Sequence, residues 1–251
     1  MQLNGLSVLM TGGASGLGAA TARAMAAKGA KVAVLDMNKA AAEQVASEIG
    51  GVALIADVAE EAPVKAALAA AEAAHGIVRI LVNCAGVASA VKTVNKNGAY
   101  PLDEFKRNIN INLVGTFNVI RLVAERMQSA PPIGEERGVI INASVAAYDG
   151  QVGQAGYSAS KAGVVGMTLP IARDLASLLI RVNSIAPGLF LTPLLLGLPE
   201  EAQRSLATQV PHPSRLGDPR EYAALAVHIV ENPMLNGETI RLDGAIRMAP
   251  R

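Results

Sequence analysis

Near the N-terminus stands Ser7-Val-Leu-Met-Thr-Gly-Gly-Ala-Ser-Gly-Leu-Gly18, an apolar run followed at once by a glycine cluster. We expect a strand over Ser7–Met10 and a helix that begins near Gly16. Glycines 12, 16 and 18 permit a tight turn, and they let backbone N–H groups approach an anionic group at the helix N-terminus. The spacing is GxxxGxG, which also occurs in ordinary turns, so the cluster alone leaves a phosphate-binding loop and a plain turn equally open.

Similar apolar runs recur along the chain, with Ala-rich stretches of helical periodicity between them. This alternation predicts βαβ units, right-handed crossovers and one α/β domain over residues 1–251, a doubly wound, seven-stranded parallel sheet with helices on both faces. Strands are predicted at Ser7–Met10, Val32–Leu35, Val52–Ile55, Ile80–Val82, Val139–Ile141, Val182–Ile185 and Thr239–Leu242. Helices are predicted at about 16–28, 39–49, 60–74, 102–128, 153–178 and 218–231.

Three irregular segments interrupt this pattern, at Val87–Pro101, Ser129–Gly138 and Pro187–Gly217. Long connections in a compact α/β domain are usually lids or binding loops. The last of them, at about 187–217, is predicted to be a substrate lid. None has the composition of an interdomain linker.

The composition favours a buried parallel sheet and a small-molecule partner. Hydrophobic residues make up 51% of the 251 residues and charged residues 17%, which suits strands covered on both faces. The net charge of +1 provides no basic field for nucleic acid or an anionic membrane, so neither partner is expected. No apolar stretch approaches the length of a membrane span.

Cysteine and histidine usage argues against a metal site. A single cysteine, Cys84, excludes an internal disulfide and fits a reducing compartment. The three histidines, His75, His212 and His228, show no ligand spacing, so no metal is predicted. The first residues lack a charged n-region or an Arg-rich transit segment, and we expect a cytoplasmic protein.

Asp36 ends the second apolar run, about twenty residues beyond the glycine cluster, where an acidic residue can reach an adenosine ribose. A carboxylate there accepts hydrogen bonds from ribose hydroxyls and repels a 2′-phosphate. No Arg or Lys stands at Ala14, Ser15 or Met37 to counter it, although Lys39 is close. NAD is therefore favoured over NADP. The alternative for Asp36 is a turn residue at the end of a strand.

The third and fourth strands also end in candidate nucleotide contacts. Asp57 and Val58 are placed to hold an adenine edge, and Asp57 could equally cap the next helix. Asn83-Cys-Ala-Gly86 ends the fourth strand with small residues that would let a cofactor cross the sheet edge. Ligands of open α/β sheets lie outside the carboxyl ends of the strands.

Tyr157 and Lys161 stand four residues apart in a predicted helix, with Ser144 thirteen positions upstream of Tyr157 at a strand end. At this spacing the phenol and the ammonium share one helix face, so the charge can lower the pKa of the phenol and make it a usable base. The pair therefore predicts proton-transfer catalysis. Taken alone, Ser144 would be an ordinary strand-end hydroxyl.

The glycine cluster, Asp36, the Asn83–Gly86 run, Asn112, Ser144 and the Tyr157/Lys161 pair all stand in order. In this combination the chain resembles the short-chain dehydrogenase/reductase family over essentially its whole length. The resemblance implies a single-domain Rossmann fold with strand order 3-2-1-4-5-6-7 and an NAD-dependent dehydrogenase.

The resemblance also implies roles for individual residues. Tyr157 would be the base in oxidation and the acid in reduction, and Lys161 would assist it and bind the nicotinamide ribose. Ser144 would hold the substrate oxygen, Asn112 would anchor a water relay behind the lysine, and Gln154 would contact substrate. The predicted cofactor contacts are Gly12, Ser15, Gly16, Leu17, Gly18, Asp36, Asp57, Val58, Asn83, Cys84, Ala85, Gly86, Tyr157, Lys161, Pro187, Phe190 and Thr192.

A closer resemblance is to the 3-hydroxyacyl-CoA dehydrogenase branch of the family. It implies reversible oxidation of a short or branched 3-hydroxyacyl-CoA in fatty acid and branched-chain amino acid degradation, and a homotetramer. Lys92, Lys96 and Lys106 would then meet CoA phosphates, or they are ordinary solvated lysines. The runs that carry this resemblance include Gly138-Val-Ile-Ile-Asn142, Gly150-Gln-Val-Gly-Gln154, Met167-Thr-Leu-Pro-Ile-Ala-Arg-Asp-Leu175 and Arg241-Leu-Asp-Gly-Ala-Ile-Arg247.

One departure concerns the end of the catalytic helix. The family usually has a proline and a glycine where this chain has Ser177-Leu-Leu179, so a helix-stopping glycine is lost. The helix at 153–178 is also apolar on more than one side, and we expect one side to meet a second copy of the chain.

Three alternatives stay open. An apolar lid with Leu189, Leu191, Leu194, Leu195, Leu196 and Leu198 could accept a hydroxysteroid or another secondary alcohol. A cofactor-binding scaffold without turnover is a second alternative, against which the intact Ser144, Tyr157 and Lys161 argue. A 3-oxoacyl reductase of fatty-acid synthesis is the third, and Asp36 disfavours its NADPH.

Overall fold

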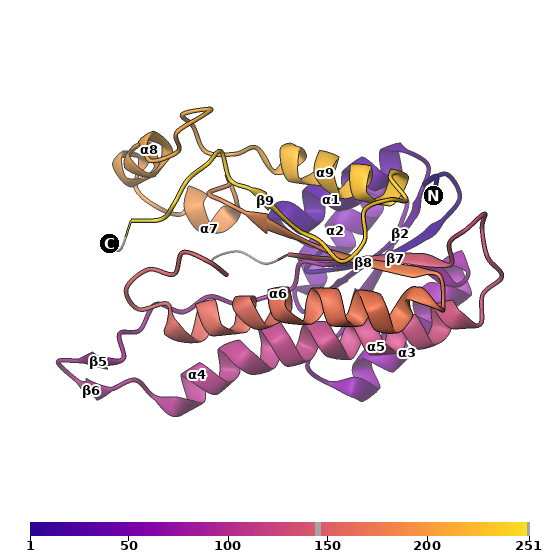
Figure 1. Cartoon of the computed structure of the whole chain (residues 1–251), viewed down its shortest axis with the longest axis horizontal. Helices are drawn as coiled ribbons and strands as arrows, with labels where there is room; N and C mark the ends of the chain where they lie inside the picture. The colour runs from indigo at the N-terminus through magenta and orange to yellow at the C-terminus, as the bar shows by residue number, and fades with distance from the viewer. Residues whose placement is uncertain (144–146, 250–251) are drawn as a thin grey trace.

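Seven parallel strands form the central sheet in the order β3-β2-β1-β4-β7-β8-β9 (Figure 1). This computed structural model describes residues 1–143 and 147–249. All seven predicted strands and their order are confirmed. The strand numbers differ from the predicted ones only because β5 and β6 form a separate hairpin outside this sheet. The strands are β1 Ser7–Thr11, β2 Lys31–Asp36, β3 Val52–Ile55, β4 Val78–Asn83, β7 Gly138–Ala143, β8 Ile180–Pro187 and β9 Thr239–Leu242.

Helices cover both faces of the sheet, as predicted. One layer holds α1, α2 and α9, and the other holds α3, α5 and α6 (Figure 1). The helices are α1 Gly16–Ala27, α2 Lys39–Ile49, α3 Glu61–His75, α4 Leu102–Ile109, α5 Thr116–Gln128, α6 Ala155–Ala176, α7 Pro193–Leu196, α8 Glu200–Thr208 and α9 Pro219–Glu231, with a π-helical segment η1 over Asn110–Gly115.

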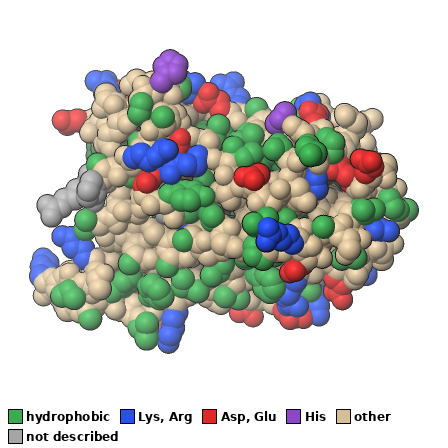
Figure 2. All heavy atoms as spheres, in the orientation of Figure 1, with side chains coloured by type: hydrophobic (Ala, Val, Ile, Leu, Met, Phe, Trp, Pro, Cys, Tyr) green, Lys and Arg blue, Asp and Glu red, His purple; other side chains and the backbone are tan. Residues whose placement is uncertain are grey.

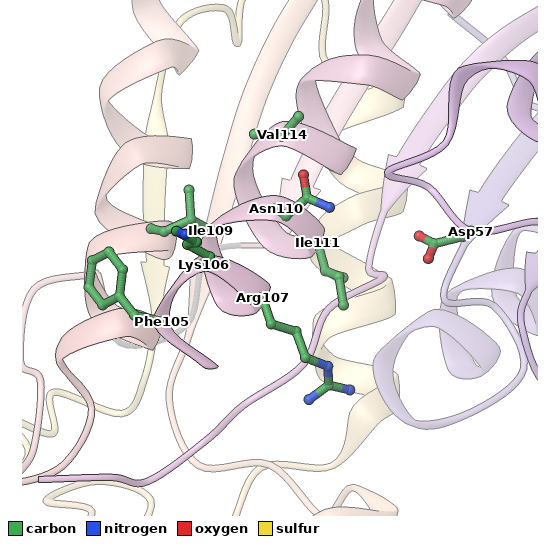
Figure 3. A pocket seen from close by; sticks show the side chains of 8 residues that line it. All are labelled: Asp57, Phe105, Lys106, Arg107, Ile109, Asn110, Ile111 and Val114. Atoms are coloured by element: carbon green, nitrogen blue, oxygen red, sulfur yellow. The ribbon is translucent and has the colours of Figure 1, made fainter. Parts of the chain in front are cut away.

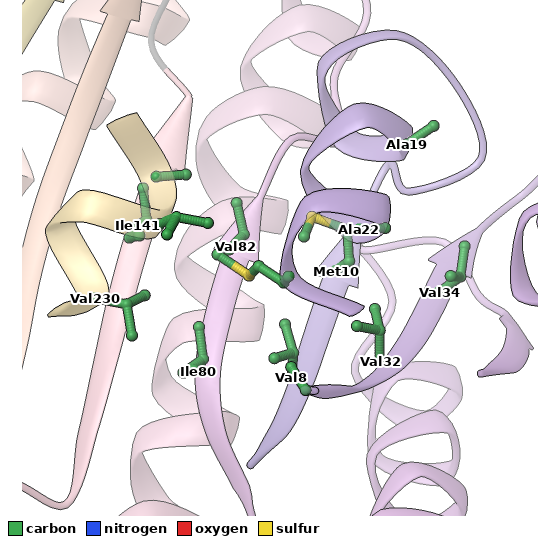
Figure 4. Packing of buried hydrophobic residues seen from close by; sticks show 14 of the residues in the cluster. Val8, Met10, Ala19, Ala22, Val32, Val34, Ile80, Val82, Ile141 and Val230 are labelled. Atoms are coloured by element: carbon green, nitrogen blue, oxygen red, sulfur yellow. The ribbon is translucent and has the colours of Figure 1, made fainter. Parts of the chain in front are cut away.

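The first strand shows why the sheet is buried on both sides. Val8 and Met10 point into the cluster under α1 and α9, which Figure 4 shows, whereas Leu9 points into the cluster under α3 and α5. All three side chains are fully buried. Burying each of them contributes roughly 1.5–3 kcal/mol. Because successive side chains point into two different buried clusters, apolar residues are needed at consecutive positions of the strand.

A row of polar side chains crosses the sheet inside this apolar core. Thr11, Asn83, Asn142 and Ser184 are register partners on four neighbouring strands, and all four are buried. Asn83 Nδ2 donates to Asn142 Oδ1 at 3.0 Å, and Asn142 Nδ2 donates to Ser184 Oγ at 3.5 Å. The Ser184 hydroxyl lies 2.7 Å from that of Thr168 on α6. Each buried polar group thereby has a partner.

The structure adds elements that the sequence did not predict. Residues 102–128 form α4, η1 and α5 in succession rather than one regular helix. The segment Val87–Pro101 contains a hairpin of β5 Val94–Asn95 and β6 Gly98–Ala99. The predicted lid, residues 187–217, contains α7 and α8.

The hairpin, the lid and the C-terminus gather at one end of the molecule, on the left of Figure 1. Acidic and basic side chains are interspersed over the face in Figure 2, in line with the small net charge. Within the described residues, no helix is both long and apolar enough to span a membrane.

The C-terminal end of α6 lacks the glycine that usually stops this helix in the family. Helix α6 ends at Ala176, and the following Leu179 adopts a φ of 60°. A glycine would take this left-handed conformation without steric cost, whereas a leucine does so at a cost of about 1–2 kcal/mol.

Candidate active site

The glycine turn between β1 and α1 requires glycine for steric reasons. Gly12 has a φ of 63°, and a Cβ built on it would lie 2.6 Å from the backbone N of Ala85. A Cβ on Gly18 would overlap the carbonyl oxygen of Gly12. The turn is therefore pressed against the end of β4, and the absence of side chains lets a ligand approach the N-terminus of α1. This fits the phosphate-binding interpretation better than that of a plain turn.

Asp36 lies beside the glycine turn, at the end of β2. Its Oδ2 accepts a hydrogen bond from the Ala14 N–H at 3.2 Å, and its Oδ1 accepts one from the Asn38 N–H at 3.0 Å. The carboxylate is thus held against the turn by backbone donors, with lone pairs left for ribose hydroxyls.

Asp57 does not cap the helix that follows it, so that alternative is wrong. Helix α3 begins only at Glu61, and Asp57 Oδ1 instead accepts from the Ala59 N–H at 2.9 Å. Asp57 lies on the wall of a shallow cavity of about 710 Å³ formed with α4 and η1 (Figure 3). Its neighbour Val58 is buried, and the Val58 carbonyl accepts from Asn118 Nδ2.

The run Asn83–Gly86 joins the glycine turn to the catalytic helix. The Ala85 N–H donates to Thr11 Oγ1 at 3.3 Å. A Cβ on Gly86 would lie 3.0 Å from Asn112 Oδ1 and 3.3 Å from Lys161 Nζ. Burial raises the pKa of Cys84 to about 11, so this thiol is neutral and acts as a small packing residue.

Tyr157 and Lys161 lie one turn apart on α6, as the spacing predicted. Lys161 Nζ is 5.9 Å from the centroid of the Tyr157 ring, and it donates to the Ala143 carbonyl at 3.1 Å. The expected lowering of the phenol pKa is not found. Burial instead raises the pKa of Tyr157 to about 12 and lowers that of Lys161 to about 8. Desolvation outweighs the attraction between the two groups in this apolar surrounding.

Asn112 lies in the π-helical segment and is fully buried. Its side chain accepts from the Val87 N–H and donates to the Val87 carbonyl, both at 2.8 Å. It also donates to Ser160 Oγ at 3.0 Å. Asn112 thereby fastens the start of the 87–101 segment to the catalytic helix.

Ser144, predicted to hold the substrate oxygen, lies outside the described residues. The strand that leads to it, β7, ends at Ala143 beside Lys161.

A cavity of about 630 Å³ lies over the carboxyl ends of the strands. The predicted residues that it brings together are Leu17, Gln154, Tyr157, Pro187, Phe190 and Thr192. Gln154 is held at the cavity by its Oε1, which accepts from the Gln151 N–H at 3.1 Å. Gly16 faces Thr192, whose side chain lies 3.4 Å from a Cβ built on that glycine, so the glycine turn and the predicted lid adjoin.

Other candidates lie away from this cavity. Lys92 and Lys96 are exposed on the 87–101 segment, and Lys106 lines the cavity of Figure 3, where it is 3.6 Å from Asp103. Among the described residues, no group of His, Cys, Asp or Glu is arranged to hold a metal ion.

Several cavity residues were not predicted as site residues. They come from the 87–101 segment, the connection after β7 and the C-terminal part of the chain. They are Ala88, Ser89, Ala90, Ala147, Tyr148, Asp149, Gln151, Arg241, Asp243, Ile246 and Met248. Some of them belong to the runs 150–154 and 241–247 that carried the family resemblance, but the resemblance assigned them no role.

Comparison with known proteins finds relatives of this chain in sequence. The family model described as short chain dehydrogenase matches residues 7–203. The chain is 57% identical to 3-hydroxyacyl-CoA dehydrogenase type-2 of Rattus norvegicus and 58% identical to that of Homo sapiens, over 99% of this chain and 97% of each relative. It is 34% identical to a 3-oxoacyl-[acyl-carrier-protein] reductase of Thermotoga maritima, over 98% of this chain and 99% of that relative.

The fold is also that of a solved relative. The crystal structure of a 3-hydroxyacyl-CoA dehydrogenase type-2 from Mycobacterium avium superposes with a TM-score of 0.94, at 40% identity and 98% coverage of both chains.

Proposed function

Because this chain belongs to the short-chain dehydrogenase family, and is thus an oxidoreductase with a nicotinamide cofactor, we propose that it interconverts short or branched 3-hydroxyacyl-CoA and 3-oxoacyl-CoA with NAD. The observation that carries this proposal is the Tyr157/Lys161 pair on α6, whose tyrosine lines the 630 Å³ cavity beside the glycine turn. Relatives at 57–58% identity bear the name of that activity.

The residues present fit a dinucleotide. At Gly12 and Gly18 a Cβ would collide with the backbone of the chain itself, so only glycine permits the tight turn that presents the N-terminus of α1 to a pyrophosphate. Asp36 would hold the adenosine ribose and repel a 2′-phosphate, which supports NAD rather than NADP. The other residues that would hold the cofactor are Ser15, Gly16, Leu17, Asp57, Val58, Asn83–Gly86, Tyr157, Lys161, Pro187, Phe190 and Thr192.

A bound nicotinamide would supply the hydride acceptor in oxidation and the hydride donor in reduction. Tyr157 takes the proton from the substrate hydroxyl in oxidation and returns it in reduction. With its pKa at about 12 the phenol is neutral near pH 7, which is the form that donates a proton. Oxidation needs the phenolate, so the nearby Lys161 ammonium must stabilise it during the reaction. Ser144 would hold the substrate oxygen.

The cavity suits a small acyl group. Its lid wall is formed by Leu189, Leu195, Leu198 and Leu206, and Gln154 lies at the same cavity. Apolar walls with few polar groups orient a short aliphatic chain without leaving buried polar atoms unpaired. The same leucines support the second candidate substrate class, a hydroxysteroid. The side chain of Leu194 is outside the described set.

A homotetramer is part of the proposal. Large apolar side chains are exposed on the outer helices, including Val114 on η1, Phe117 on α5 and Leu169 on α6, each 44–48% exposed. Such residues are typical of surfaces that meet another chain. A monomeric sedimentation profile at micromolar concentration would contradict this part of the proposal.

The function is tested by following NADH absorbance with acetoacetyl-CoA, longer and branched 3-oxoacyl-CoA and ketosteroids. We expect the highest kcat/KM with a short or branched thioester and NADH. Preference for ketosteroids would favour the second candidate. Binding of NADH without turnover of any substrate would indicate a scaffold, and preference for NADPH would favour a reductase of fatty-acid synthesis.

A further inference from the structure

Arg241, near the end of β9, contacts two separate segments of the chain at the wall of the large cavity. Its Nη2 donates to Asp149 Oδ2 and to the Ile246 carbonyl, the latter at 3.2 Å, and its Nε donates to Asp243 Oδ2 at 2.7 Å. The guanidinium carbon lies 5.0 Å from the centroid of the Tyr148 ring. Ion pairing and the cation–π contact thus fix the position of this side chain.

Two of these contacts belong to the connection between β7 and α6, residues 147–154. This connection leads directly into the helix that carries Tyr157 and Lys161. The other contacts belong to residues 243–249, which we call the C-terminal strap. A second link joins the same two segments, because Gln151 Nε2 donates to the Ala249 carbonyl at 3.1 Å.

The strap is also held on its other side. The Gly188 N–H donates to the Leu242 carbonyl at 2.9 Å, and a Cβ on Gly188 would lie 2.8 Å from Asp243 Cα. The N–H of His212, near the C-terminal end of the lid, donates to the Gly244 carbonyl at 3.2 Å. The strap therefore lies between the lid and the connection.

The strap contributes two apolar side chains, Ile246 and Met248, to the cavity that also contains Tyr157. Ile246 is buried and Met248 is half-buried. Leu195 and Leu198 of the lid line the same cavity. A substrate at Tyr157 thus shares one space with the strap and the lid.

We propose that the C-terminal strap limits the size of the acyl group through Ile246 and Met248, and that Arg241 is the positioning residue that locks the strap to the connection. The inference rests on the proposed function, because it names the part of the cavity that would select among acyl-CoA substrates.

The charges explain why Arg241 acts as a lock rather than as an anion-binding residue. Its donors already serve Asp149 and Asp243, and Asp243 also accepts from Arg247 at 3.2 Å. The carboxylates of Asp149 and Asp243 are only 25% and 10% exposed. Removal of Arg241 would leave two partly buried carboxylates beside one another, and their repulsion would separate the strap from the connection.

The size limit is tested with Met248→Ala. We expect the ratio of kcat/KM for 3-oxooctanoyl-CoA to that for acetoacetyl-CoA to rise about tenfold, since small changes of volume in an apolar pocket produce selectivity of that order. The KM for NADH should not change. An unchanged ratio would overturn the assignment of Met248 as a wall of the acyl site.

The lock is tested with Arg241→Gln. We expect the KM for acetoacetyl-CoA to rise about tenfold with a smaller change in kcat, which is the pattern of lost substrate positioning. Arg241→Lys should recover only part of the loss, because lysine lacks the planar fork. Arg241→Gln combined with Asp149→Asn should recover more, because it removes the unbalanced charge. The control is Arg247→Gln, which removes an exposed arginine from the same Asp243 and should match the wild type.

Hydrogen exchange separates this inference from the proposed function. Arg241→Gln should accelerate exchange in both the connection and the strap, whereas Arg247→Gln should not. If Arg241→Gln exchanged at wild-type rates in both segments, the proposed role of Arg241 would be overturned, irrespective of which substrate the enzyme uses. If the wild type turned over no acyl-CoA, the proposed function would fail, and the exchange result would still decide whether Arg241 holds the strap.

Discussion

Lys161 carries its ammonium 5.9 Å from the centroid of the Tyr157 ring, one turn further along α6. Burial opposes the charged form of both groups, because it raises the pKa of Tyr157 to about 12 and lowers that of Lys161 to about 8. The geometry needed for catalysis is thus present in the chain, while the ionisation of the phenol is not. The rate of oxidation should therefore reach its maximum at a higher pH than the rate of reduction.

Tyr157→Phe should lower kcat about a hundred- to ten-thousand-fold, because it removes the proton donor and acceptor while retaining the ring. Steady-state kinetics with NADH and acetoacetyl-CoA measure the effect, and circular dichroism checks the fold. Tyr222→Phe is the matched control, because Tyr222 is a core residue whose hydroxyl lies 3.8 Å from Cys84 Sγ. Near-wild-type turnover by Tyr157→Phe would refute the assignment of the base.

The stability of the protein should depend on the titration of Lys161. Below about pH 8 its amine is protonated in both the folded and the unfolded chain, and the folded state bears the cost of a buried charge. Between about pH 8 and 10.5 only the unfolded chain keeps this proton, so the contribution of Lys161 to the free energy of unfolding increases with pH. The full change corresponds to about 3 kcal/mol.

Urea denaturation of the wild type and Lys161→Met at a series of pH values measures this contribution. We expect the wild type to gain stability relative to the variant across that window. Lys65→Met, which removes an exposed lysine from α3, controls for the loss of a lysine as such. A wild-type–variant difference that stays flat with pH would contradict the burial of a charged Lys161.

Asp36→Asn should lower the preference for NAD over NADP about tenfold or more, because a like charge no longer meets the 2′-phosphate. The asparagine retains one acceptor for the Ala14 N–H, so the turn should keep its shape. The measurement is kcat/KM with each cofactor. Asp103→Asn, which removes a carboxylate exposed on α4, is the control. Unchanged cofactor selectivity would show that Asp36 does not recognise the ribose.

Gly12→Ala and Gly50→Ala form a matched pair, because Gly12 has a φ of 63° and Gly50 a φ of 64°. Both substitutions carry a left-handed backbone cost of about 1 kcal/mol. Only at Gly12 would the new Cβ collide with the backbone of Ala85, since no atom lies within 4 Å of a Cβ at Gly50. The Kd for NADH, from fluorescence titration, should rise at least about tenfold in Gly12→Ala alone. Equal affinity in both variants would mean that the turn does not bind the cofactor.

Leu179→Gly should stabilise the protein by about 0.5–1 kcal/mol, because it relieves a left-handed leucine while adding some entropy to the unfolded chain. The backbone contacts of Leu179 should persist, since its N–H donates to the Ala176 carbonyl and its carbonyl accepts from the Arg137 N–H. Leu179→Ala keeps the Cβ and should give no such gain. Chemical denaturation measures both, and equal effects of the two substitutions would place the strain elsewhere.

The strands were predictable because each contains a short aliphatic run, even at the two edges of the sheet, where β3 and β9 are only partly buried. Val52–Ile55 and Thr239–Leu242 have the predicted bounds. The helices of the lid were not predictable in this way. Pro193 and Pro199 lie in the segment predicted to be irregular, whereas in the structure they stand at the starts of α7 and α8, where proline is tolerated.

The Tyr157/Lys161 pair and the glycine turn were predictable from local spacing, since the residues of each lie within a few positions of one another in the sequence. The electrostatic state of Tyr157 was not, because spacing fixes a separation but gives no information on burial. The role of Arg241 was also hidden. Its partner Asp149 stands 92 residues away, and only the folded sheet brings the two together.

The buried row of Thr11, Asn83, Asn142 and Ser184 has a consequence for the alignment of the strands. A slip of any one strand by a single residue, about 3.3 Å, would turn its polar side chain to the opposite face and set it among aliphatic groups. Each misplaced amide would then lack a partner at a cost of about 1–3 kcal/mol. The row therefore selects one register for four parallel strands, so that the glycine turn, the Asn83–Gly86 run and Lys161 meet at the same height above the sheet.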